Sequence, residues 1–231
     1  MRILAIVPAR KGSKGVTQKN IHLLNGKPLI FWTLNECKEF DSTIDVVVST
    51  DSQKIANISK DLGFPVDSLR PAEFSGDNVE TLDVLQYETI KREKKVGFKY
   101  DYVLLLQPTS PLRKVHHIRE CITLLDDEID SVVSIKNVQG DHPFRMKRVC
   151  GSKLVNFIDQ GFEDMRPRQK LPPVYIRNGA IYLTKSELIR SKISLVGENC
   201  SFYEMSQNDS INIDNLFDFY ATESVMREYQ L

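Results

Sequence analysis

Short apolar runs alternate with longer amphipathic stretches along the first part of the chain, and this alternation most restricts the folds open to it. The runs Val46-Val47-Val48 and Val103-Leu104-Leu105-Leu106 are apolar at every position, as parallel strands covered on both faces must be. Such alternation is typical of βαβ units. We therefore expect an α/β fold with a doubly wound, mostly parallel sheet. The expected strands are 3–7, 45–49, 102–106 and 131–134, and the expected helices are 29–39, 52–62, 79–94 and 115–125.

The composition and apolar pattern of the sequence change between residues 137 and 174. Apolar runs become shorter, Arg and Lys become more frequent, and Pro172-Pro173 precedes a strand-like run at 180–183. A chain of 231 residues suffices for one α/β core but hardly for two. We expect a single domain spanning 1–231 with an inserted arm at about 137–174. An ordered surface loop fits the same composition.

Charge and hydropathy narrow the classes of partner. The chain carries 31 Lys and Arg against 31 Asp and Glu, whereas nucleic-acid-binding proteins usually have a basic excess. No apolar run approaches the length of a membrane span, and the chain enters its first strand without a signal-peptide pattern. We expect a cytoplasmic protein without nucleic-acid or membrane partners. The four cysteines show neither zinc-site nor disulfide spacing.

The loop after the first expected strand gathers cations and glycines. It reads Arg10-Lys11-Gly12-Ser13-Lys14-Gly15, and ligands of α/β sheets collect beyond the carboxyl ends of strands. Glycines let a backbone approach an anion closely, and Lys and Arg form charge-assisted bonds to phosphate oxygens. Neither the Walker pattern nor G-x-G-x-x-G is present. The loop favours a nucleoside triphosphate, although a solvated basic turn would have the same composition.

Six segments in order match one family. The first, Pro8-Ala9-Arg10 through Lys19-Asn20, resembles the P-A-R-x-x-S-K-x-x-x-x-K-N signature of the acylneuraminate cytidylyltransferases, which make CMP-sialic acid and related CMP-nonulosonates. The others are Arg70-Pro71-Ala72-Glu73, Leu106-Gln107-Pro108-Thr109-Ser110-Pro111-Leu112-Arg113, Arg166-Pro167-Arg168-Gln169, Asn178-Gly179-Ala180-Ile181-Tyr182 and Ile211-Asn212-Ile213-Asp214.

The resemblance implies an activity and an assembly. It implies a Rossmann-like nucleotidyltransferase that uses Mg²⁺ to transfer CMP from CTP to the anomeric hydroxyl of a nonulosonic acid, releasing pyrophosphate for surface polysaccharide synthesis. It also implies a homodimer whose arms each help to cover the partner's active site. Ser13-Lys14-Gly15 favours neuraminate or legionaminate over pseudaminate as the acceptor.

The resemblance also assigns residues to the nucleotide. Fixed cations aimed at the departing pyrophosphate favour the transition state, so Arg10 and Lys14 are also the expected catalytic cations. Asn20 would contact the nucleotide, or cap the segment of Ile21 by bonding nearby backbone. Asp77 would lie beside the cytidine, or cap the following helix. The expected nucleotide-binding residues are Arg10, Ser13, Lys14, Lys19, Asn20, Arg70 and Asp77.

A second group is assigned to the sugar acid. Arg166 and Arg168 supply two guanidinium groups, which bind planar carboxylates through paired bonds; an interface of salt bridges is the alternative. Gln107 offers a donor and an acceptor. Asn178 and Tyr182 match family positions near the acceptor, although Tyr182 suits a core position equally well. Arg113 would pair with a phosphate or with a neighbouring Asp.

The expected metal site departs from the family pattern. Relatives carry Asp-x-Asp where this chain has Asn212-Ile213-Asp214. Residues two apart on a strand share a face, so Asp214 and the amide oxygen of Asn212 would hold Mg²⁺ together with water and phosphate, and Asp214 is a third expected catalytic residue. Asp218 would substitute as a ligand or cap the last helix.

Two other functions fit these residues. One is a related sugar nucleotidyltransferase that takes another nucleotide or a sugar lacking a carboxylate, which would not require Arg166 and Arg168. The other is a CTP-binding homologue without catalysis, which the missing carboxylate at Asn212 suggests.

Overall fold

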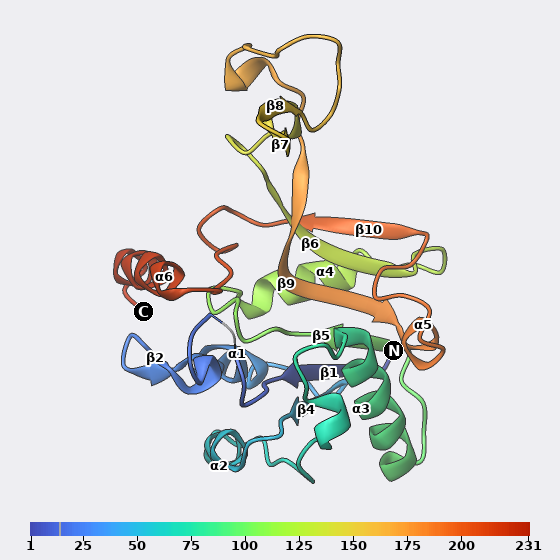
Figure 1. The fold of residues 1–231 in the computed structure, drawn as a ribbon. Helices are drawn as coiled ribbons and strands as arrows, with labels where there is room; N and C mark the ends of the chain where they lie inside the picture. Colours follow the sequence, from blue (N-terminus) through green and yellow to red (C-terminus); the bar gives the residue numbers. More distant parts are fainter. Residues whose placement is uncertain (14) are drawn as a thin grey trace.

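A six-stranded sheet forms the centre of the computed structural model, which describes residues 1–13 and 15–231. Five strands of the sheet in this part of the chain run parallel and β9 runs antiparallel between β6 and β5 (Figure 1). The expected mostly parallel sheet is confirmed. In spatial order its strands are β10 (Cys200–Glu204), β6 (Ser131–Asn137), β9 (Tyr175–Lys185), β5 (Tyr102–Leu105), β1 (Ile3–Pro8) and β4 (Ile44–Ser49).

Helices cover both faces of this sheet because its central strands are apolar on both sides. Along β1, Ile3 and Val7 belong to one buried cluster and Leu4 and Ile6 to another. The first cluster packs against α1, α2 and α4, and the second packs against α3 and α5. The helices are α1 (Leu29–Cys37), α2 (Gln53–Asp61), α3 (Thr81–Val96), α4 (Val115–Thr123) and α5 (Ser186–Arg190).

A third apolar cluster lies beyond the carboxyl ends of the parallel strands. It packs the last helix, α6 (Leu216–Glu228), through Phe219 and Met226 against Leu29 and Ile213. A small ribbon of β2 (Leu23–Leu24) and β3 (Lys27–Pro28) follows the 3₁₀ turn Lys19–Ile21. The segment that follows β1 and the last helix therefore meet at this edge.

The strand expected at 180–183 belongs to a longer strand with a bulge. Its pairing with β6 shifts register between Val133 and Ile135, so Ser134 stands opposite residues 178–181. The Ser134 hydroxyl donates to Asn178 Oδ1 at 2.6 Å and accepts from the Ile181 amide at 2.8 Å. Bulges of this kind redirect a chain next to functional sites.

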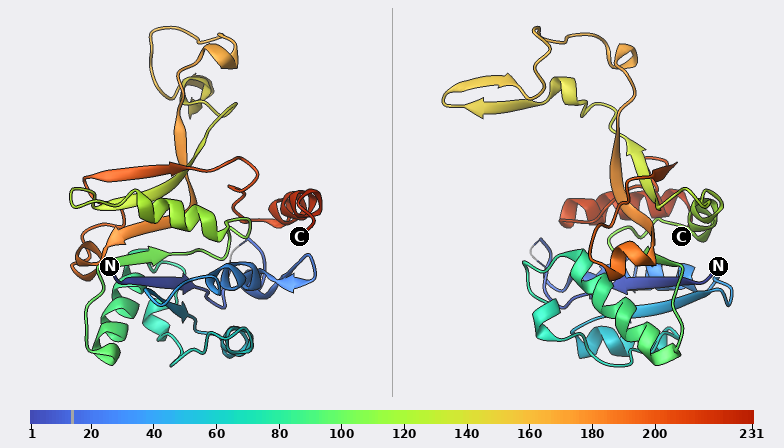
Figure 2. Two further views of the ribbon diagram at one scale, coloured as in Figure 1. Left: turned by 180° about the vertical axis from the view of Figure 1, so that it is seen from behind. Right: turned by 90° about the vertical axis from the view of Figure 1, so that its right-hand side faces the viewer.

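The segment 138–174, called the arm below, projects from the sheet (Figures 1 and 2). It leaves from β6 and returns into β9, and it contains the hairpin of β7 (Lys147–Cys150) and β8 (Lys153–Asn156). Its large apolar side chains are mostly exposed. They include Val149, Leu154, Phe157, Phe162 and Met165.

None of the helices in the described residues is both long enough and apolar enough to span a membrane.

Candidate functional site

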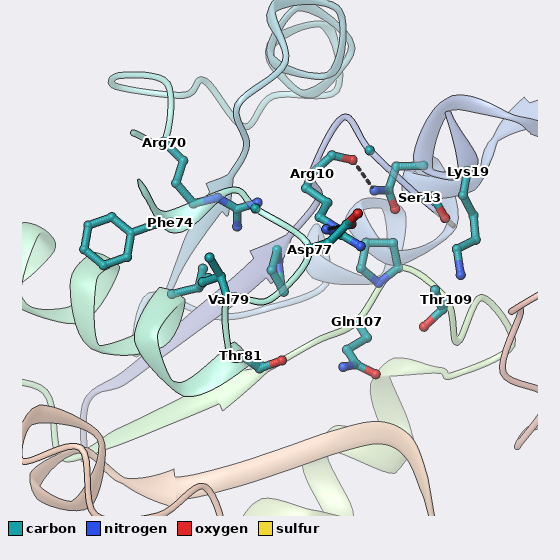
Figure 3. Close-up of a pocket in the computed structure, with 16 residues that line it drawn as sticks. Arg10, Ser13, Lys19, Arg70, Phe74, Asp77, Val79, Thr81, Gln107 and Thr109 are labelled. Atoms are coloured by element: carbon teal, nitrogen blue, oxygen red, sulfur yellow. Dashed lines mark hydrogen bonds and ion pairs between the residues drawn. The ribbon is translucent and has the colours of Figure 1, made fainter. Parts of the chain in front are cut away.

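A cavity of about 300 Å³ opens beyond the carboxyl ends of β1 and β5 (Figure 3). Parallel strands that end at one edge bring their following loops together there. The loop after β1, the turn at Lys19, the segment before α3 and the loop after β5 all contribute. Among its lining residues are Arg10, Ser13, Lys19, Asn20, Arg70, Phe74, Asp77, Val79, Gln107 and Thr109. Six of the seven residues expected at the nucleotide are among them; the seventh, Lys14, lies outside the described residues.

The cavity has two chemically different ends. Arg10, Ser13 and Lys19 gather at one end, and Phe74 and Val79 lie toward the other (Figure 3). Phe74 stacks on Tyr87, with ring centroids 4.6 Å apart. One end therefore suits a polyanion and the other a flat ring. A nucleotide has the same arrangement, with phosphates at one end and a base at the other.

Arg10 forms an ion pair across the cavity. Its Nη1 lies 2.6 Å from Asp77 Oδ1, which joins the loop after β1 to the segment before α3. Helix α3 begins at Thr81 after the N-cap Glu80, so the alternative that Asp77 caps this helix is wrong. Within residues 1–13 and 15–231 the other donors of the Arg10 guanidinium form no hydrogen bond and are available to an anion.

The loop after β1 is anchored to the segment before α6. Lys19 Nζ donates to the Ile213 carbonyl at 2.8 Å and lies 3.4 Å from Asp214 Oδ1. A Cβ on Gly15 would overlap the carbonyl oxygen of Asp214, whereas one on Gly12 would meet nothing within 4 Å. Gly15 thus allows two segments of the chain to pack closely. The expected role of this glycine was instead to allow close approach of an anion.

Asn20 is buried beneath this loop. Its Nδ2 donates to the Arg10 carbonyl at 2.9 Å, so its side chain fixes the turn that presents Arg10. The 3₁₀ turn Lys19–Ile21 has Gln18 as its N-cap, so the alternative that Asn20 caps this segment is wrong. Asn20 also lines the cavity, and its contact with the nucleotide stays a prediction.

Arg70 is a buried cation at the wall of the cavity. Its Nε donates to Ser75 Oγ at 3.3 Å and its Nη1 to Ser49 Oγ at 3.4 Å. Burial lowers the pKa of Arg70, and the carboxylates of Asp51 and Glu88 oppose that shift. Ser49 and Glu88 escaped the sequence reasoning because buried polar residues on a strand and a helix carry no motif.

Gln107 meets the bulge of β9 at Gly179. Gly179 has φ of +81°, and a Cβ there would lie 3.1 Å from Gln107 Oε1 and 3.7 Å from Asn212 Oδ1. A residue without a side chain is therefore needed where these two amides converge.

Arg113 holds the backbone at Gln107 and at the bulge of β9 in place. Its Nη1 donates to the carbonyls of Gln107 at 3.1 Å and Ala180 at 2.9 Å, and its Nη2 donates to Thr33 Oγ1 at 2.8 Å. Burial lowers the pKa of Arg113 to about 10. The expectation that it pairs with a phosphate or an Asp is wrong, since it joins the loop after β5 to the bulge.

Asn212 and Asp214 lie side by side as expected, with Asn212 Nδ2 donating to Asp214 Oδ2 at 2.8 Å. Their segment is not a strand, and the buried side chain of Ile213 anchors it. Asp218 Oδ2 accepts from the amides of Asp214 and Asn215 as part of the α6 capping box. No group of three His, Cys, Asp or Glu suited to a metal occurs in the described residues.

Asn178 and Tyr182 have partners within the fold. Asn178 is buried and bonds Ser134, the Ala180 amide and Ser210. Tyr182 packs against the buried cluster on the α3 face of the sheet. These contacts account for both residues without a ligand, and their roles at the sugar stay predictions.

Arg166 and Arg168 are on the arm and do not line the cavity. Arg166 forms a two-pronged pair with Asp164, at 3.0 Å from Nε to Oδ1 and 2.6 Å from Nη2 to Oδ2. This pair lowers the pKa of Asp164 to about 2. Arg168 makes one longer contact, 3.3 Å from Nη1 to Gln139 Oε1. Among the described residues its guanidinium therefore forms fewer hydrogen bonds than that of Arg166.

Comparison with known proteins identifies relatives of the whole chain. Residues 4–208 match the family model described as cytidylyltransferase. The chain is 33% identical over 234 residues to a CMP-N,N'-diacetyllegionaminic acid synthase of Legionella pneumophila, covering 98% of this chain and 97% of that protein. It is 34% identical to an N-acylneuraminate cytidylyltransferase of Streptococcus agalactiae, covering 95% of this chain but 52% of that protein.

A solved structure shares the fold. A CMP-2-keto-3-deoxy-manno-octonic acid synthetase in complex with CTP superposes with a TM-score of 0.73 at 15% identity, covering 99% of this chain and all of that one.

Replacing Gly15 with alanine tests the anchoring of the loop after β1. Because its Cβ would overlap the Asp214 carbonyl, Gly15→Ala should lower the free energy of unfolding by about 1–3 kcal/mol, the usual cost of overpacking. Urea denaturation measures this cost. Gly12→Ala, in the same loop with open space around it, is the matched control. Equal stability of the two variants would contradict the anchoring.

Proposed function

Because the chain belongs to the cytidylyltransferase family, we propose that it transfers CMP from CTP to the anomeric hydroxyl of a nonulosonic acid and releases pyrophosphate. The observation that carries this proposal is the cavity with a cationic end at Arg10 and Lys19 and an apolar end at Phe74. The names of the two relatives support an acceptor of the legionaminic or neuraminic type.

The proposed reaction is a displacement at the α-phosphorus of CTP. The anomeric hydroxyl of the sugar acid gives up its proton to solvent as its oxygen forms the new P–O bond, and the bond from the α-phosphorus to the bridging oxygen of the β-phosphate breaks. Negative charge grows on the departing pyrophosphate, and Arg10 and Lys19 stabilise it from positions set by Asn20 and Ile213. Lys14 joins them in this proposal on its sequence motif alone.

Gln107 is placed to orient the acceptor. Its side chain lies at the Gly179 turn, and Arg113 holds its backbone. An amide that both donates and accepts suits a polyhydroxylated sugar acid. Orientation of the anomeric oxygen supplies much of the expected catalysis, since positioning two reactants removes a large entropic cost.

Pyrophosphate release tests the activity. With CTP and Mg²⁺ we expect release with legionaminic or neuraminic acid and not with pseudaminic acid or Kdo. Arg10→Ala should lower kcat by about 100-fold or more, the usual effect of removing one transition-state donor. Lys11→Ala, on the same loop but not lining the cavity, is the control. Release unchanged in the Arg10 variant would contradict the role of this loop.

We further propose that Mg²⁺ binds at Asp214 and Asn212. Asn212 Oδ1 is buried and, within the described residues, has no hydrogen-bond partner, while the Asp214 carboxylate is exposed beside it. One carboxylate and one amide oxygen fit Mg²⁺ when phosphate oxygens and water complete its shell. Bound there, the ion would neutralise charge on the phosphates.

Asn212→Asp tests this metal site. A second carboxylate should tighten the ion, so the Mg²⁺ concentration for half-maximal activity should fall severalfold, and Mn²⁺ titrated calorimetrically in the presence of CTP should bind more tightly. Asn212→Ala should shift both quantities the opposite way. Identical metal binding by all three proteins would place Asn212 outside the coordination shell.

The arm supports a homodimer in which each arm reaches the other subunit. Its exposed side chains, such as Val149, Leu154 and Met165, form the kind of apolar surface that marks protein interfaces. Arg168 lies on the projecting arm and does not line its own cavity. We propose that a second copy covers this surface and receives Arg168 beside its bound sugar acid.

Subunit mixing tests the exchange of arms. Arg10→Ala and the double variant Arg166→Ala, Arg168→Ala should each be impaired, and mixing them should restore activity because one site in each heterodimer has an intact loop and an intact arm. Failure to restore activity would indicate that each arm serves its own subunit. Met165→Asp should give monomers in sedimentation, and Ile193→Asp, exposed outside the arm, should not.

A further inference from the structure

A carboxylate is buried behind the cavity and has no role in the proposed chemistry. Glu88 on α3 is 2% exposed, and a buried charge is costly unless it is paired or hydrogen-bonded. Its Oε1 accepts from the Ser49 hydroxyl at 2.7 Å, and its Oε2 lies 3.4 Å from Lys91 Nζ. The contact with Ser49 joins α3 to the end of β4, and the contact with Lys91 stays within α3, one turn further on.

The Ser49 hydroxyl has a fixed direction because of this carboxylate. A serine has one hydrogen to donate, and Glu88 takes it. The oxygen of Ser49 is therefore left as an acceptor toward Arg70 Nη1, 3.4 Å away. Ser75 repeats the pattern on the other side, since its hydrogen goes to the Pro71 carbonyl at 2.9 Å and its oxygen accepts from Arg70 Nε.

The two serines leave one edge of the Arg70 guanidinium for a ligand. Within residues 1–13 and 15–231, the hydrogen bonds of its side chain use Nε and Nη1. The group is directed into the cavity between Phe74 and Arg10 (Figure 3). A guanidinium only donates. The O2 and N3 atoms of cytosine both accept, whereas uracil presents an N3–H donor at the same edge.

We infer that Glu88 is a positioning residue for the choice of nucleotide base: through Ser49 it holds the donor edge of Arg70 against the acceptor edge of a cytosine ring. This inference rests on the proposed function, because it requires the base to lie at the Phe74 end of the cavity. A merely structural Glu88 would tie α3 to β4 without affecting the choice between bases.

The test compares the affinity of the full chain for CTP and UTP, titrated calorimetrically with Mg²⁺. Ser49→Ala removes the oxygen that Arg70 contacts, and Glu88→Met removes the acceptor that orients it at similar side-chain volume. Each variant should lower the ratio of CTP to UTP affinity about tenfold, or ~1.4 kcal/mol. Glu93→Met is the control, because Glu93 is also on α3 but pairs with Arg190 at 2.8 Å.

The outcomes separate the inference from the proposed function. A wild-type preference for CTP that survives in both folded variants overturns the role of Glu88 and leaves the proposed function standing. Equal affinity of the wild-type chain for CTP and UTP overturns both. If Glu88→Met does not fold, Ser49→Ala alone decides, since it removes a single oxygen atom. An equal loss of base selectivity in Glu93→Met would also overturn the inference.

Discussion

The contact of Gly15 with the backbone of Asp214 is the constraint on which the site depends. It brings the loop after the first strand against the segment that precedes the last helix. Lys19 reinforces the contact by donating to the Ile213 carbonyl. Residues some two hundred positions apart thereby form one wall, and the cationic end of the cavity depends on both of these segments being folded.

Two buried guanidinium groups shape the rest of the site. A buried cation is tolerated when most of its donors are hydrogen-bonded. The Nη1 and Nη2 groups of Arg113 bond backbone carbonyls and a threonine hydroxyl, whereas its Nε has no partner within the described residues. Arg70 uses two serine hydroxyls with a carboxylate behind one of them. Arg113 thus holds the backbone at Gln107, whereas Arg70 keeps donors available within the cavity as far as the described residues go.

Much of this fold can be predicted from the sequence, because the strands and the loops at their ends depend on local chemistry. The apolar runs predict the parallel strands, and the rule that ligands bind beyond strand ends predicts the cavity with Arg10 and Gln107. The direction of β9 was not predictable, since an apolar run reads the same in either direction. The contacts of Asn178 follow from a bulge that forms only when β6 and β9 pair. Glu88 was missed because its partner Ser49 lies on another element.

The bulge at Ser134 divides the β6–β9 ladder into two short ladders. One ladder pairs residues 131–133 with residues 182–184 in the core of the sheet. The other pairs residues 135–137 with residues 175–177, next to the arm. Cooperative opening propagates along continuous ladders and stops where pairing is interrupted. The ladder of residues 135–137 is therefore separate from the one in the core of the sheet, so amide exchange along β9 should change abruptly within a strand that looks continuous.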